Sequence, residues 1–140
     1  MRNFRIECRE EFVEWISGLG FTQSVTLAFN RDITRSGAEY KLKKLHEQLD
    51  RLALQVSSAK LGLIAAPVLS IALIEHPTSN LHIHMLWHAP QFEEKLVKAM
   101  PRIWKKLMPK GNAKNRAIVP NDPIYRYVTK ELTADSYILS

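Results

Sequence analysis

The chain has 140 residues, of which 20 are Lys or Arg and 14 are Asp or Glu, and its formal net charge of +6 gives a pI of about 9.6. This length and a 46% share of hydrophobic residues predict one domain over 1–140 and exclude an intrinsically disordered chain. Cys8 is the only cysteine, which excludes a disulfide framework and a cysteine zinc site and favours a cytoplasmic location. No apolar run is long enough to cross a membrane, so we expect no membrane partner.

Hydrophobic periodicity predicts the helices and strands in chain order. Apolar residues at three- and four-residue steps indicate helices, and strict alternation indicates strands. In the first strand Val25 and Leu27 alternate with Ser24 and Thr26, so one face is apolar and the other more polar. The expected elements are a helix at 8–18, a strand at 21–30, a helix at 38–57, strands at 68–75 and 81–87, a helix at 91–108, a strand at 115–119 and a helix at 124–132.

The order of these elements indicates an α+β fold. Without the first and last helices it is β-α-β-β-α-β, the ferredoxin-like or split βαβ arrangement, in which both helices pack on one face of an antiparallel sheet. We expect the other face to be open to a ligand, and the added helices, the last of which carries tyrosines, to flank the core. Pro101 lies inside the helix at 91–108, so we expect that helix to be kinked or divided.

The predicted hairpin carries a candidate metal site. His82 and His84 are two residues apart on a strand, so their imidazoles leave the same face. Glu75 ends the partner strand and can supply a carboxylate oxygen across from them. Two imidazoles and one carboxylate suit a divalent transition metal and leave positions open, as in catalytic sites. His76 and His88 are better interpreted as ordinary loop and strand-end residues.

The last predicted helix carries a candidate nucleophile. Tyr127 and Lys130 are three residues apart, so they project from nearly the same side of a helix. A phenol attacks as its anion, which a neighbouring ammonium favours. Tyr125 points about 200° away on the same helix and is better suited to packing. The alternative is that both tyrosines only anchor the helix.

Basic residues gather in one segment that contains no acidic residue. Such a stripe suits a phosphate backbone, because each neutralised phosphate releases counterions. The alternative is that these residues form solvated helix faces. The candidate nucleic-acid contacts are Lys95, Lys98, Arg102, Lys105, Lys106, Lys110, Lys114 and Arg116.

Together these features resemble the HUH endonucleases, and in particular the replication-initiator (Rep) nucleases of rolling-circle plasmids and viruses. The resemblance runs from about residue 21 to residue 132. Three segments carry it: the strand 24–30, the His-hydrophobic-His metal motif at His82 and His84 after Glu75, and the Tyr-x-x-Lys nucleophile motif from Tyr127 to Lys130.

The resemblance implies an enzyme that nicks and rejoins single-stranded DNA at an origin or hairpin. His82, His84 and Glu75 would hold Mn²⁺ or Mg²⁺, which would polarise the scissile phosphate. Tyr127 would attack that phosphate to give a 5′-phosphotyrosine intermediate and a free 3′-OH, and Lys130 would supply positive charge beside it. Many Reps carry a helicase domain after the nuclease, so a helicase partner and an excised nuclease domain both stay open.

Three alternatives were weighed against this interpretation. A single-tyrosine transposase or a mobilisation relaxase of the same superfamily would share the chemistry, and Tyr125 leaves a two-tyrosine scheme open. A non-catalytic nucleic-acid-binding module on the same scaffold, similar to RNA-recognition domains, would expect exposed aromatic residues on the central strands, where this chain has His82 and His84. A two-histidine phosphoesterase needs two separate His-x-Thr/Ser motifs, which the sequence lacks.

Overall fold

The computed structural model describes most of the chain as one α+β arrangement. Its helices and strands are α2 (Arg9–Ser17), β1 (Gln23–Ala28), α3 (Arg35–Ala59), β2 (Leu69–Glu75), β3 (His82–His88), α4 (Glu93–Leu107), β4 (Asn112–Ala117), α5 (Ile124–Val128) and β5 (Tyr137–Leu139). The described residues are 9–59, 68–75, 80–89, 93–130 and 137–139, with side chains for all of these except 54–59 and 137–139.

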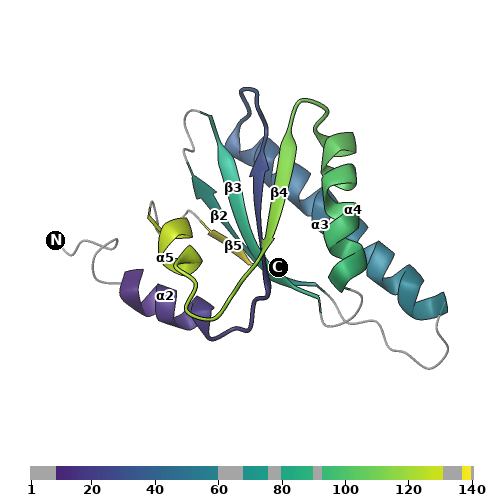
Figure 1. The fold of residues 1–140 in the computed structure, drawn as a ribbon. Coiled ribbons are helices and arrows are strands. Elements are labelled where there is room, and N and C mark those ends of the chain that lie inside the picture. The colour runs from purple at the N-terminus through teal and green to yellow at the C-terminus, as the bar shows by residue number, and fades with distance from the viewer. Residues whose placement is uncertain (1–8, 60–67, 76–79, 90–92, 131–136, 140) are drawn as a thin grey trace.

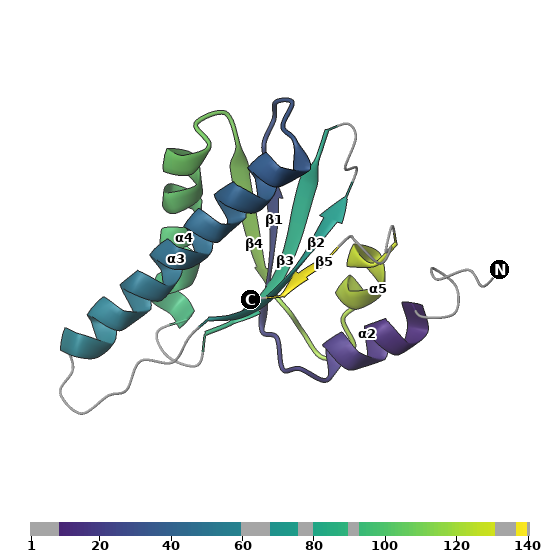
Figure 2. The ribbon, with the colours of Figure 1, turned by 180° about the vertical axis from the view of Figure 1, so that it is seen from behind.

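The five strands form one sheet in the order β4-β1-β3-β2-β5, and every neighbouring pair is antiparallel. The long helix α3 and the helix α4 cover one face of this sheet (Figure 2), as the alternation in the strands predicts. Their apolar stripes, which include Leu45 and Leu49 on α3 and Met100 and Trp104 on α4, are fully buried against strand residues such as Trp87. Burial of each large apolar side chain stabilises the fold by about 1.5–3 kcal/mol.

The turn from α4 into β4 is fixed by close contacts with β1. Trp104 donates its indole Nε1–H to the carbonyl oxygen of Ala28 at 3.2 Å, and its ring meets the ring of Phe29 edge to face. A Cβ at Gly111 would lie 2.5 Å from the same carbonyl oxygen. Only glycine therefore lets the turn pass this close to β1, and this approach places β4 at the sheet edge.

Of the two outcomes expected at Pro101, a kink or a division of the helix, the structure excludes the division. The helix α4 runs without interruption from Glu93 to Leu107 with Pro101 inside it. Proline removes one backbone hydrogen bond, but Pro101 is exposed, so its ring faces solvent rather than the core. The buried side chains of Leu96, Met100 and Trp104 hold the helix on the sheet on both sides of the proline.

The other face of the sheet is partly covered, whereas the sequence predicted it to be open. In Figure 1, α2 and α5 lie together in front of one part of this face. They bury a second apolar cluster in which Ile16 of α2 and Val128 of α5 meet Ile71, Leu73 and Leu86 of the sheet. On the sheet face opposite α3 and α4, only the region beside this apolar cluster is therefore left uncovered by α2 and α5.

Some boundaries differ from those that the sequence predicted. β4 begins at Asn112 rather than at Asn115, and α5 ends at Val128, so Lys130 lies in the turn after the helix. The strand β5, which pairs with β2, was not predicted. His76 and the end of the helix expected at 124–132 lie outside the described residues. Among the helices of the described ranges, none has the length and apolar character that a membrane span requires.

Candidate active site

The sheet register brings the predicted metal ligands to one face. His82 lies directly opposite Glu75, and His84 lies between Thr26 and Leu73 on the neighbouring strands. Residues directly opposite one another in antiparallel strands share a face. Glu75, His82 and His84 therefore all project to the face that α2 and α5 partly cover, on the side away from α3 and α4.

The centre of the site is an ion-paired cluster around Glu75. One carboxylate oxygen of Glu75 is hydrogen-bonded to Nε2 of His84, and the other lies 3.0 Å from the ammonium of Lys130. The second ring nitrogen of His84, Nδ1, lies 3.3 Å from the hydroxyl oxygen of Thr26. Both ring nitrogens of this buried histidine are thus engaged, and so are both carboxylate oxygens.

The three ionisable groups shift one another's proton affinity. Burial opposes ionisation of Glu75, but hydrogen bonds from Lys130 and His84 outweigh it and hold the carboxyl pKa below its usual value. Burial lowers the pKa of His84, while the hydrogen bond to Glu75 raises the pKa of the Lys130 ammonium. At neutral pH the cluster is therefore an anion, a neutral imidazole and a cation. A neutral ring that donates from Nε2 to Glu75 accepts at Nδ1 from the Thr26 hydroxyl.

Tyr127 stands at the exposed side of this cluster. Its ring meets the His84 ring edge to face, with 5.6 Å between centroids, and the Lys130 ammonium lies 4.1 Å from the centre of the tyrosine ring. Tyr127 is 54% exposed, so much of this side chain faces solvent. Tyr125 instead packs against the apolar cluster under α2 and α5, and burial raises its pKa.

The position of α5 is set by Asp122, which sequence reasoning missed. Its buried carboxylate accepts the backbone N–H groups of Val119 and Ile124 and pairs with both terminal nitrogens of Arg116, at 2.7 and 3.0 Å. The Arg116 hydrogen bonds and these backbone donors hold the pKa of the Asp122 carboxyl far below its usual range. An acid one residue before Pro123 at a helix start is the signal that could have identified it.

α2 holds α5 from the other side. Glu10 forms an ion pair with Arg126, with a second oxygen–nitrogen contact of 2.7 Å, and Arg9 donates to the Arg126 carbonyl oxygen at 2.9 Å. The short helix therefore has side-chain ties to both β4 and α2. These ties keep Tyr127 beside His84 although α5 alone has too few residues to be stable as a helix.

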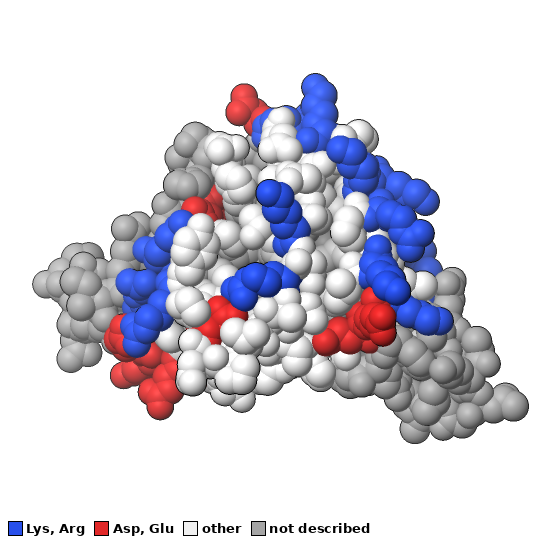
Figure 3. All heavy atoms as spheres, in the orientation of Figure 1, with Lys and Arg blue, Asp and Glu red and all other residues white. Residues whose placement is uncertain are grey.

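A cavity of about 450 Å³ opens beside Tyr127. Its charged lining comes from β4, where Lys114 lies directly opposite Thr26 in the register. Figure 3 shows basic side chains over β4 near the middle of this face, with an acidic side chain against part of them. The lining residues are Ser24, Thr26, Lys114, Asn115, Arg116, Pro123, Ile124 and Tyr127.

The chemistry of the donor set fits a divalent metal ion. Two imidazoles and a carboxylate project from adjacent strands to one face, and all three are established metal-ligand types. In the part of the chain that the structure describes, no three His, Cys, Asp or Glu side chains are yet gathered closely enough to hold an ion. In the present arrangement the Glu75 carboxylate is instead neutralised by Lys130.

The predicted basic residues divide between two faces. Five of them are on α4, which packs on the opposite face from His84, and Lys110 is in the turn before β4. Only Lys114 and Arg116 line the cavity beside Tyr127, and Arg116 is already paired with Asp122. Figure 3 shows the basic side chains over α4 along the edge next to β4. The residues on α4 are Lys95, Lys98, Arg102, Lys105 and Lys106.

His88 lies away from the site, in a cluster at the other end of β3. Its Nδ1 is 3.1 Å from the hydroxyl oxygen of Thr22 and 3.2 Å from a carboxylate oxygen of Glu93. Glu93 also accepts the backbone N–H of Ala89 and so joins the start of α4 to β3. This placement agrees with the strand-end role that the sequence favoured for His88.

Comparison with known proteins gave no match for this chain: no protein-family model, no curated protein and no solved structure is similar to it at a significant level.

Proposed function

We propose that this chain is a metal-dependent, HUH-type endonuclease that nicks and rejoins single-stranded DNA, as Rep nucleases do when they initiate rolling-circle replication. One observation carries the proposal. The exposed Tyr127 lies against His84 and under Lys130, at the mouth of a cavity that holds a further cation, Lys114. A nucleophile, imidazole and carboxylate ligands, and positive charge for a phosphate are thus side by side.

The strand order supports the same proposal at the level of the fold. The sequence β-α-β-β-α-β with the sheet order β4-β1-β3-β2 is compatible with a ferredoxin-like scaffold. Because proteins of many different functions use such a scaffold, the fold alone gives only weak support for nuclease activity. The stronger support comes from the residues around Tyr127.

The reaction we propose is a phosphodiester transesterification. The hydroxyl oxygen of Tyr127 attacks the scissile phosphorus, a bond forms between them, and the bond from phosphorus to the 3′-oxygen breaks. The phenol loses its proton and the departing 3′-oxygen gains one, so the products are a 5′-phosphotyrosine link and a free 3′-OH. The reverse reaction with a 3′-OH rejoins the strand.

The side chains around Tyr127 have separate tasks in this proposal. Lys130 neutralises the phenolate and the charge that builds up on the phosphate, and Lys114 positions the strand in the cavity. Thr26 orients the ring of His84 through its hydroxyl. His82, His84 and Glu75 would hold a divalent ion such as Mn²⁺ or Mg²⁺, which would supply Lewis-acid polarisation of a phosphate oxygen.

The test is the metal dependence and end chemistry of cleavage. Labelled single-stranded DNA that carries origin and hairpin sequences is incubated with the chain and Mn²⁺, with EDTA in a parallel reaction. We expect cleavage only with the metal, a 3′ end that a polymerase extends, and a 5′ end that is blocked by protein. Cleavage in EDTA, or a free 5′ phosphate, would contradict the proposal. Binding without cleavage would favour a non-catalytic nucleic-acid-binding module.

A further inference from the structure

A second basic concavity lies between α3 and α4, on the face of the sheet away from Tyr127. We call it the helix groove, and its volume is about 340 Å³. The lining includes three cations and no acidic residue. Its residues are Gln48, Arg51 and Leu52 on α3 and Ala99, Arg102, Ile103 and Lys106 on α4.

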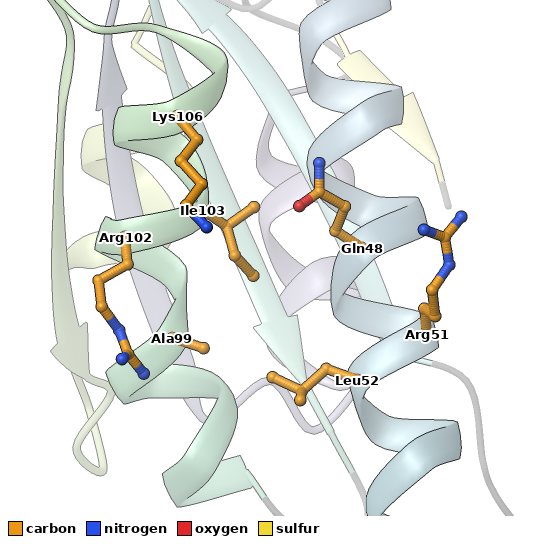
Figure 4. Close-up of a pocket in the computed structure, with 7 residues that line it drawn as sticks. All are labelled: Gln48, Arg51, Leu52, Ala99, Arg102, Ile103 and Lys106. Carbon is orange, nitrogen blue, oxygen red and sulfur yellow. The ribbon is translucent and has the colours of Figure 1, made fainter.

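Helical spacing explains why these residues face one another. On each helix the lining residues are three or four apart, so they form one stripe along its side. Figure 4 shows Ile103 of α4 and Gln48 and Leu52 of α3 pointing into the gap between the helices, with Lys106 beside Ile103 on α4. Arg51 and Arg102 flank the gap on its outer sides in the same view. The groove is thus lined by apolar side chains such as Leu52 and Ile103. The cations Arg51, Arg102 and Lys106, which we call the rim cations, surround them.

The rim cations have no acidic partner among the described residues. Lys98 pairs with Glu94 on the outer surface of α4, and Lys44 pairs with Glu47 on α3. Within the described part of the chain no such ion pair forms at Arg51, Arg102 or Lys106, all of which are exposed, and none forms at Lys95 or Lys105 on α4 either. A concavity with three uncompensated cations is complementary to an anionic ligand that contacts several of them at once.

We propose that the helix groove binds the phosphate backbone of DNA, as a contact separate from the Tyr127 site. The continuity of the positive charge favours DNA over an acidic protein segment. In the chain, the basic residues of α4 are followed by Lys110 in the turn before β4 and by Lys114 on β4. Figure 3 shows basic side chains along the edge over α4 and, on the other face of the sheet, over β4. A linear polyanion can follow this path from one face of the sheet to the other. The proposal does not depend on Tyr127, because DNA can be held here even if the chain cleaves nothing.

Arg51 is the most informative residue for a test because it is on α3, outside the basic segment of the sequence. Its control is Lys43, which is also exposed on α3 but does not line the groove. The variants Arg51→Gln and Lys43→Gln each remove one charge from the same helix. Arg51→Glu reverses the charge and gives a second measurement at the groove. All four proteins are measured in EDTA, so that cleavage does not contribute.

The measurement is the affinity for single-stranded DNA across a series of salt concentrations. We expect Arg51→Gln to reduce the slope of log K against log salt by about 0.7, the value for one lost phosphate contact on a single strand, and Arg51→Glu to reduce it at least as much. Lys43→Gln should keep the wild-type slope. Equal slopes in all four proteins, or no DNA binding by the wild type, would overturn the proposal. Tighter binding of poly-glutamate than of DNA, lost in Arg51→Gln, would overturn it in favour of an acidic protein partner.

Discussion

The strand β3 carries two clusters of the same composition, and one of them, around His84, lies beside Tyr127 and Lys130 in the candidate active site. Each joins a β3 histidine to a β1 threonine and a glutamate: His84 with Thr26 and Glu75, and His88 with Thr22 and Glu93. The side chain of His84 is 6% exposed and that of His88 is 35% exposed. The residue types therefore do not distinguish the His84 cluster from the His88 cluster. The residues around each cluster distinguish the two.

The two glutamates differ in the groups that bind their carboxylate oxygens. Glu93 accepts from Thr22, Gln23 and the backbone of Ala89, so its oxygens are used by neutral donors that fix the start of α4. Glu75 is held by a histidine and by the partly exposed side-chain ammonium of Lys130, which a bound cation can replace. A site for chemistry needs such an exchangeable partner and a reactive group beside it. The His88 cluster therefore provides matched controls for the His84 cluster.

The largest expected effect is on the histidines. His84→Ala should reduce metal-dependent DNA cleavage at least about 100-fold, because it removes a ligand that holds the metal, whose contribution to the reaction is several kcal/mol. His88→Ala should cleave nearly as fast as the wild type. Cleavage rates are compared after circular dichroism has shown that both variants are folded. A folded His84→Ala protein with full cleavage would remove the metal site.

A smaller effect is expected at the threonines. Thr26→Val keeps the shape of the side chain but removes the hydroxyl that contacts Nδ1 of His84. Loss of such an orienting hydrogen bond weakens metal binding by about 10- to 100-fold. Thr22→Val, in the control cluster, should leave Mn²⁺ affinity unchanged. Calorimetric titration with Mn²⁺ measures both, and equal affinities in the two variants would contradict the role of Thr26.

We expect Lys130→Ala to slow cleavage about tenfold without abolishing it. The ammonium contributes to charge neutralisation, but the metal still acts as the Lewis acid. The same variant should bind Mn²⁺ at least as tightly as the wild type, because Glu75 no longer has to give up its ion pair. Single-turnover rates and Mn²⁺ titrations separate the two effects. Weaker Mn²⁺ binding would show that Lys130 supports the carboxylate rather than competing for it.

Substitution of Asp122 is expected to have the smallest effect on DNA cleavage. It should nevertheless lower the free energy of unfolding clearly. Asp122→Asn weakens the pairing with Arg116 and two backbone hydrogen bonds, at a cost of about 2 kcal/mol in the free energy of unfolding. The folded-state pKa of Asp122 lies below its ordinary value of 3.8, so this stabilisation is present above pH 3.8 and is lost as the pH falls further. The difference in thermal unfolding temperature between the two proteins should therefore be largest at pH 7 and should decrease steadily as the pH is lowered below 3.8. A difference in unfolding temperature that does not change with pH would show that the Asp122 carboxylate is not the source of this stabilisation.

Periodicity predicted the parts of the fold that bury an apolar face. Alternation in β1 and β3 assigned Val25 and Ile83 to the helical side and Thr26 and His84 to the other, and the structure confirms these faces. The start of β4 was missed because Asn112–Ala117 is almost entirely polar. That strand is an edge strand, where charged side chains are common and alternation gives little signal. β5 has only three residues, too few to show a period.

The sequence predicted which residues make up the candidate site, but not how they pair. Spacing placed His82 and His84 on one face and separated Tyr127 from Tyr125. It did not predict that Lys130 would leave the helix and pair with Glu75, because that depends on where α5 ends. A position of the last helix across this face, near His82 and His84, was expected because it follows the last strand closely. The packing of α2 beside it was missed, since it rests on tertiary contacts between segments more than 100 residues apart, such as Arg9 with Arg126 at a separation of 117.

The proposed function requires Tyr127 to become covalently linked to DNA. Mapping of the protein–DNA adduct measures this link. Wild type, Tyr127→Phe and Tyr125→Phe are incubated with single-stranded DNA and Mn²⁺, and the DNA-linked peptide is identified by mass spectrometry. Because Tyr127 is exposed beside His84 and Tyr125 packs in the apolar cluster, we predict an adduct on Tyr127 in the wild type and in Tyr125→Phe. Tyr127→Phe should form none. An adduct on Tyr125, or one in Tyr127→Phe, would contradict the account.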